Sequence, residues 1–181
     1  MYEGRNIVEE RIEHLRERVA MCCYQVVTKL DVTAWEVPGE PVSFSTAAAA
    51  EFKPFPSGTW WGRPWSTWWL RVAGQIPAEY LNSKLELRIN LGFKGDWAGN
   101  QSEGMVFTSD GWPLKGVNPM NRTVPLNYGA TAALAQKRKT PIISPDGNLN
   151  LVIEAAANPN LSHVIGKVTQ LGDYHTAPDD P

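Results

Sequence analysis

Residues 60–72 read Trp60-Trp61-Gly62-Arg63-Pro64-Trp65-Ser66-Thr67-Trp68-Trp69-Leu70-Arg71-Val72, and this stretch holds five of the chain's eight tryptophans. Successive side chains of a β-strand point to opposite faces. The alternation from Ser66 onward therefore places Trp68, Leu70 and Val72 on one face, and Trp69 and Arg71 on the other. We expect the Trp68 face to be the core, so that truncating Trp68 costs more stability than truncating Trp69, and the Trp69 ring to stack with Arg71. Aromatic side chains on both faces indicate a β-sandwich.

Several later segments also have strand patterns. Lys84 to Leu91 alternates without interruption and predicts one buried face, formed by Leu85, Leu87, Ile89 and Leu91. Residues 104–114 read as a hairpin because Asp110-Gly111 suits a tight turn. Residues 122–127 and 149–154 are further strands, and residues 47–50 form a short helix packed on the sheet. The interval 128–147 is expected to be a surface excursion. The sequence predicts a mainly β fold, an antiparallel β-sandwich of jelly-roll type.

The N-terminal segment has a helical pattern instead. Between Arg5 and Tyr24, apolar residues recur at spacings of four and three, whereas the other faces are charged; the apolar positions are Val8, Ile12, Leu15, Val19 and Cys22. This amphipathic α-helix must bury its stripe, either on its own domain or on another subunit or domain. We divide the chain into a helical segment (1–30), a β-sandwich (31–175) and a linker-like tail (176–181).

Composition excludes several classes of protein. The net charge of −2 provides no basic surface for nucleic acid, and 43% hydrophobic residues argue against disorder. The N-terminus lacks the layout of a signal peptide, and no apolar run approaches the roughly 18 residues of a membrane span. The adjacent Cys22 and Cys23 are too close for an ordinary disulfide. We interpret the chain as cytoplasmic, with neither nucleic acid nor membrane as a partner.

The sequence indicates no catalytic machinery of its own. The chain contains three histidines but no Gly-x-Ser-x-Gly motif, so it does not predict a Ser-His-Asp triad. It also contains no His-x-His, His-x-Asp or Cys-x-x-Cys pair that would predict a metal site. Carboxylates in or beside Gly- and Trp-rich loops could form a glycosidase pair, but turn-capping roles explain them equally well. We therefore predict no catalytic residue, metal ligand or cofactor. Loop aromatics and their polar neighbours form the candidate ligand or partner surface, namely Trp60, Trp61, Arg63, Asp96, Trp97, Glu103 and Trp112.

An ordered series of motifs runs through nearly the whole chain. The residues of this series are Glu9-Glu10-Arg11-Ile12, Ala34 to Pro41, Trp61 to Val72, Ile76-Pro77-Ala78-Glu79, Leu91-Gly92-Phe93, Glu103-Gly104, Asn121-Arg122 and Glu154 to Pro159. The series resembles the N-terminal domain of glycoside hydrolase family 38 α-mannosidases of the cytosolic/vacuolar and bacterial branch. The resemblance implies a galactose-binding-like β-sandwich that stands before a larger catalytic region.

The family's catalytic motif is missing from this chain. Family 38 enzymes use a His-x-Asp zinc motif and an aspartate nucleophile, whereas none of His14, His163 and His175 is followed by x-Asp. The resemblance thus implies that zinc and the hydrolysis of α-mannosides belong to a catalytic region outside this chain. Two roles remain for the domain. It is a structural module that docks on the catalytic region or in a homo-oligomer, or a binding module that holds mannose-containing glycans through loop tryptophans. We favour the first and expect no α-mannosidase activity from the isolated chain.

Overall fold

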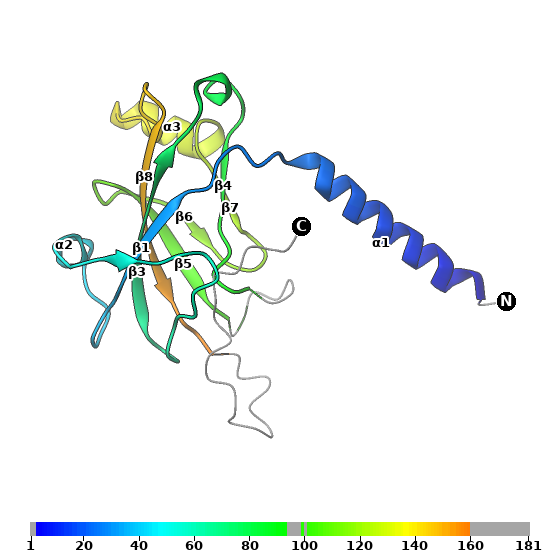
Figure 1. Ribbon diagram of the computed structural model, residues 1–181, viewed down its shortest axis with the longest axis horizontal. Coiled ribbons are helices and arrows are strands. Elements are labelled where there is room, and N and C mark those ends of the chain that lie inside the picture. The colour runs from blue at the N-terminus through cyan, green and yellow to red at the C-terminus, as the bar shows by residue number, and fades with distance from the viewer. Residues whose placement is uncertain (1–2, 94–98, 100, 160–181) are drawn as a thin grey trace.

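A six-stranded antiparallel sheet forms the larger layer of the molecule, with strand order β2-β1-β3-β8-β5-β6. The computed structural model describes residues 3–93, 99 and 101–159. A two-stranded sheet, β4-β7, forms the second layer. The predicted antiparallel sandwich is confirmed (Figure 1). The strands are β1 (Asp31–Glu36), β2 (Lys53–Pro54), β3 (Thr67–Gln75), β4 (Glu86–Arg88), β5 (Glu103–Thr108), β6 (Pro113–Val117), β7 (Thr123–Pro125) and β8 (Asn148–Ala156).

The main core lies between the two sheets. Cross-strand register aligns Ala34, Leu70, Ile153 and Val106 on the inner face of the large sheet. From the opposite layer, the predicted inward face of residues 84–91 is confirmed, because Leu85, Leu87, Ile89 and Leu91 are all buried. Side chains from both sheets therefore share one apolar interior. Burial of these side chains is the main stabilising contribution in such a sandwich.

A second core covers part of the outer face of the large sheet. Trp69 is only 1% exposed there and packs edge-on against Phe44, with ring centroids 5.9 Å apart and an interplanar angle of 75°. Phe44 begins the short helix α2 (Phe44–Ala48), whose N-cap Ser43 accepts a hydrogen bond from the Thr46 amide. The predicted short helix on the sheet is confirmed, and its Ala47 is buried in the same cluster.

This second core corrects the interpretation of the tryptophan strand. The two faces are divided as the alternation predicts, but the expectation that Trp69 stacks with Arg71 is wrong. The Arg71 guanidinium lies over the Phe52 ring at 3.9 Å and donates to the Ala48 carbonyl at 2.7 Å. Trp68 is only partly buried, at the edge of the main core. The physical reason is that α2 supplies a cover for the outer face, so both faces of β3 are buried.

The interval predicted as a surface excursion contains a further helix, α3 (Gly129–Arg138). Its Thr131 is buried and donates its hydroxyl to the Pro125 carbonyl at 2.6 Å, which attaches the helix to β7. Lys139 ends α3 in the left-handed conformation, with φ of 57°. A single turn of 3₁₀-helix, η1 (Ala78–Tyr80), precedes β4. The predicted hairpin is confirmed as β5 and β6, with Gly111 at φ of 85° in its turn.

The N-terminal helix α1 (Glu3–Cys23) stands clear of the sandwich (Figure 1). The predicted helix is confirmed, but its apolar stripe does not dock on the described part of the domain. Its larger apolar side chains are 52–59% exposed, namely Ile7, Val8, Ile12, Leu15 and Val19. No helix among the described residues is long and apolar enough to cross a membrane.

Candidate functional surfaces

Trp61 belongs to the core rather than to a binding surface. It is 4% exposed, and its ring packs edge-on against Trp68 with centroids 6.1 Å apart. Trp68 is flanked on another side by Phe55, at 5.7 Å. The expectation that Trp61 helps to form an exposed surface is therefore wrong. Its ring closes the edge of the main core, which anchors the loop before β3 to the sandwich.

Two tryptophans of the same loop are exposed. Trp60 is 60% exposed and Trp65 is 67% exposed. Trp65 has φ of 65°, a conformation that is unusual for a bulky residue, and its amide donates to the Ala157 carbonyl at 2.9 Å. Trp65 was not among the predicted surface residues, because residue type alone does not indicate its left-handed backbone conformation. A Pro-Trp-Ser junction immediately before a strand is the signal that could have indicated a turn.

Two of the predicted polar residues lie at this end of the large sheet. Arg63 donates from Nε to Glu36 Oε1 at 2.7 Å, which ties the loop to the last residue of β1. Glu103, the first residue of β5, accepts a hydrogen bond from Asn158 at 3.0 Å. We call Trp60, Arg63, Trp65 and Glu103 the strand-end surface. The remaining predicted residues of this group, Asp96 and Trp97, lie outside the described residues.

Trp112 lies away from the strand-end surface. It is in the hairpin that follows β5, whereas Glu103 begins that strand, so the expectation of a single surface is wrong for Trp112. The Arg138 guanidinium of α3 lies over its ring at 4.9 Å and also forms an ion pair with Asp110. Trp112 thus joins the hairpin to α3 through a cation–π contact, and this contact accounts for the ring without a ligand.

The Asp110 carboxylate should make the stability of this hairpin dependent on pH. The Thr108 hydroxyl, and next the Arg138 guanidinium, hold the pKa of Asp110 below its ordinary value. A carboxyl whose pKa is lower in the folded state stabilises the fold above its unfolded pKa, about 3.9, and this contribution is lost as the pH falls through the folded pKa. Because the pair is near the surface, we expect Asp110→Asn to lower the free energy of unfolding by about 0.5–1 kcal/mol at neutral pH.

Urea denaturation of the wild type and Asp110→Asn over a series of pH values measures this effect. The difference should begin to shrink as the pH falls below about 4 and should disappear once the pH is below the lowered pKa of Asp110 in the folded protein, because Asp110 is then protonated in both the folded and the unfolded state. A difference that stays constant down to the lowest pH would show that the charge of Asp110 has no part in it.

No three His, Cys, Asp or Glu side chains of the described residues are grouped as they would be around a metal ion. The donor set in this part of the chain does not fit a zinc site. The ion pairs and hydrogen bonds of the strand-end surface connect loops to strands.

The two-layer antiparallel architecture places this chain in the class of β-sandwich domains. Residues 27–176 match the sequence profile of the alpha-mannosidase jelly roll domain, of the type called Ams1-like first domain, and the chain belongs to this family. It is an accessory N-terminal domain of an α-mannosidase, as the sequence resemblance indicated. Comparison with curated proteins gave no match. The matched residues begin after α1, so the helix lies outside the segment that the family profile covers.

Proposed function

We propose that this domain docks onto the remainder of a glycoside hydrolase family 38 α-mannosidase through the apolar stripe of α1. The exposed stripe is the observation that carries the proposal. Complete burial of one aliphatic side chain stabilises a structure by about 1.5–3 kcal/mol. Four stripe side chains, Val8, Ile12, Leu15 and Val19, are more than half exposed and leave much of this stabilisation unused, which favours a surface that covers them.

The spacing and charges of α1 describe the surface that would cover it. The stripe residues Val8, Ile12, Leu15 and Val19 alternate in spacing between four and three, so they form a straight line along the helix, which we call the seam. A line of this kind packs against another helix or an elongated groove. Arginines dominate the positions beside the seam, namely Arg11, Arg16 and Arg18, with Glu9 as the acidic exception. Glu10, Glu13 and Glu17 lie farther from the seam. We therefore expect an apolar groove with an acidic rim.

Pairing of α1 with a second copy receives less support from these charges. In a parallel pair, Arg11 would lie near Arg16 of the other copy. In the antiparallel pair centred on Ile12 and Leu15, Glu9 would approach Arg16, but Arg11 would approach Arg18. Attraction and repulsion would then cancel. The charges beside the seam therefore favour another segment of the same polypeptide over a homo-oligomer as the partner.

The chemistry of the parent enzyme belongs to the same proposal. We place α-mannoside hydrolysis and the zinc ion in the catalytic region, because the described residues of this domain offer no suitable donor set. A cytoplasmic location would agree with the composition. The alternative role, glycan binding through loop tryptophans, has weaker support, because Trp61 is buried and Trp112 stacks with Arg138.

Deletion of residues 1–23 tests the docking role. We expect the shortened chain to keep the thermal stability of the sandwich, since Val8, Ile12, Leu15 and Val19 of the stripe are all more than half exposed. We also expect it to lose binding to the separately produced remainder of the polypeptide, as measured by calorimetry and co-elution in size-exclusion chromatography. Equal binding by both chains would overturn the docking role of α1.

A further inference from the structure

An open groove lies on the outer face of the large sheet, where β5, β6 and β8 are adjacent. Its volume is about 630 Å³, a size typical of small-molecule sites. Glu103 and Met105 of β5, Gly116 of β6 and Glu154 of β8 contribute to its lining. The helix α2 and the aromatic cluster of Trp69 cover a different part of this face. The groove is therefore separate from the second core, whereas Val117 of β6 contributes both to its lining and to the main core.

Few side-chain atoms cover the backbone at the floor of the groove, because Gly116 lies there. Gly116 pairs with Met105 across β5 and β6, on the outer face of the sheet. A Cβ added at Gly116 would meet a single heavy atom within 4 Å, the Gly104 carbonyl oxygen at 3.9 Å. Ala156 also contributes only a methyl group. Space for a flat ring thus exists directly above the backbone of the sheet.

The walls of the groove carry hydrogen-bonding groups. Glu103 is opposite Ala156 and Glu154 is opposite Met105, so the two carboxylates are diagonal neighbours on one face. Glu154 is partly buried, and this burial raises the pKa of its carboxyl. Within the described part of the chain, no side chain forms an ion pair with Glu154. Asn121 lines the far wall, on a turn closed by two backbone hydrogen bonds with Asn118 at 2.9 and 3.2 Å.

We infer that this groove binds a neutral sugar ring. Carboxylates accept hydrogen bonds from adjacent hydroxyl groups, and the amide of Asn121 can both donate and accept. Lys115 also lines the groove, but its Nζ donates to the Thr123 carbonyl at 2.7 Å. Two carboxylates and one lysine engaged elsewhere favour a hydroxyl-rich neutral ligand over an anion. This inference uses different residues from the docking role of α1 and does not depend on it.

Titration of the full 181-residue chain with mannose and α-linked mannobiose, followed by NMR, tests the inference. We expect millimolar binding, with amide shifts at Gly104 and Gly116. Gly116→Val should weaken binding at least tenfold, because its side chain would fill the floor of the groove, where an added Cβ meets only the Gly104 carbonyl oxygen at 3.9 Å. Glu154→Gln should also weaken binding, since it removes a charged acceptor without changing the size of the side chain. Mannose 6-phosphate should bind more weakly than mannose.

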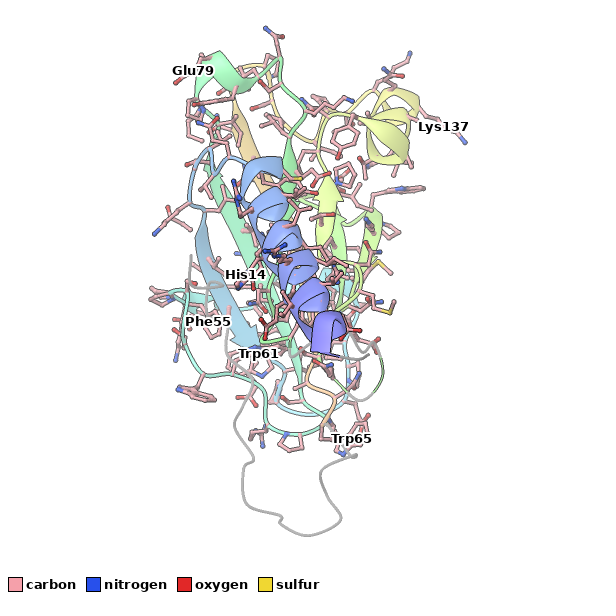
Figure 2. All side chains as sticks on the ribbon, turned by 90° about the vertical axis from the view of Figure 1, so that its right-hand side faces the viewer. His14, Phe55, Trp61, Trp65, Glu79 and Lys137 are labelled. Carbon is pink, nitrogen blue, oxygen red and sulfur yellow. The ribbon has the colours of Figure 1, made fainter. Side chains whose placement is uncertain are left out.

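Glu79→Gln is the matched control, because Glu79 is an exposed glutamate of η1, at the end of the molecule opposite Trp65 (Figure 2). It should bind as the wild type does. Absence of shifts up to roughly 50 mM sugar, well above the expected millimolar Kd, would overturn the inference. Binding that shifts Trp60 or Trp65 and is unchanged in Gly116→Val and Glu154→Gln would also overturn it, since the sugar would then lie on the strand-end surface. If Gly116→Val does not fold, sugar binding by Glu154→Gln tests the inference, and binding equal to that of the wild type would overturn it.

Discussion

Trp69→Ala is expected to lower the free energy of unfolding by about 3–5 kcal/mol, and by more than Trp68→Ala. Trp69 is completely enclosed between the sheet and α2, with Phe44 and Phe107 rings 5.9 and 5.6 Å from its own. Its removal would leave a large cavity and deprive α2 of its principal aromatic contact. Trp68 lies at the edge of the main core, where solvent and neighbouring rings can fill part of the space.

Guanidinium denaturation of the two variants measures this order, and Trp65→Ala provides a control. Because Trp65 is mostly exposed, its truncation should change the free energy of unfolding by about 0.5 kcal/mol or less. A larger loss for Trp68→Ala than for Trp69→Ala would mean that α2 and its aromatic cluster contribute little to stability.

The double variant Ile12→Gln/Leu15→Gln is expected to weaken docking on the remainder of the polypeptide at least 100-fold, or about 2.8 kcal/mol. Both side chains lie in the middle of the exposed stripe, where loss of apolar contact should have its largest effect. Glutamine has a helix propensity close to that of leucine, so α1 should remain helical. The thermal stability of the sandwich should not change.

Glu10→Gln/Glu17→Gln is the matched control, since it makes two glutamines on the same helix outside the seam and leaves the Arg16–Glu13 ion pair intact. It should change the affinity by no more than about twofold, within the range of rim residues. Calorimetric titration of both double variants separates the two cases. Equal losses of affinity would contradict docking through the apolar stripe and would assign the contact to the whole helix surface.

Alternation of side chains predicted much of this fold. It identified the buried face of residues 84–91 and the division of faces in β3, because both depend only on local period. It did not show that Trp69 would be covered, since α2 reaches it through tertiary packing. Nor did it show that Trp112 would meet Arg138, which is distant along the chain. Coverage of a face depends on neighbours that a local pattern does not contain.

The candidate surface was less accessible to prediction than the fold. Trp60 and Arg63 were placed at an exposed loop as expected, whereas the adjacent Trp61 is buried. Trp65 is presented to solvent by a left-handed backbone conformation, which residue type does not indicate. The groove on the outer face depends on Gly116 lying opposite Met105, a consequence of strand register. Such features require the folded chain.

Hydrogen–deuterium exchange of the α1 amides, compared between this chain and the full-length polypeptide, tests the docking role most directly. Most of the stability of a protein helix comes from the packing of its apolar face, and the apolar stripe of α1 is exposed, so its amides should exchange rapidly in this chain. In the full-length polypeptide, we expect the amides around Ile12 and Leu15 to exchange at least about tenfold more slowly, while those of β3 and β8 remain equally protected in both. Identical exchange of α1 in the two proteins would contradict the proposal that this helix docks on the rest of the enzyme.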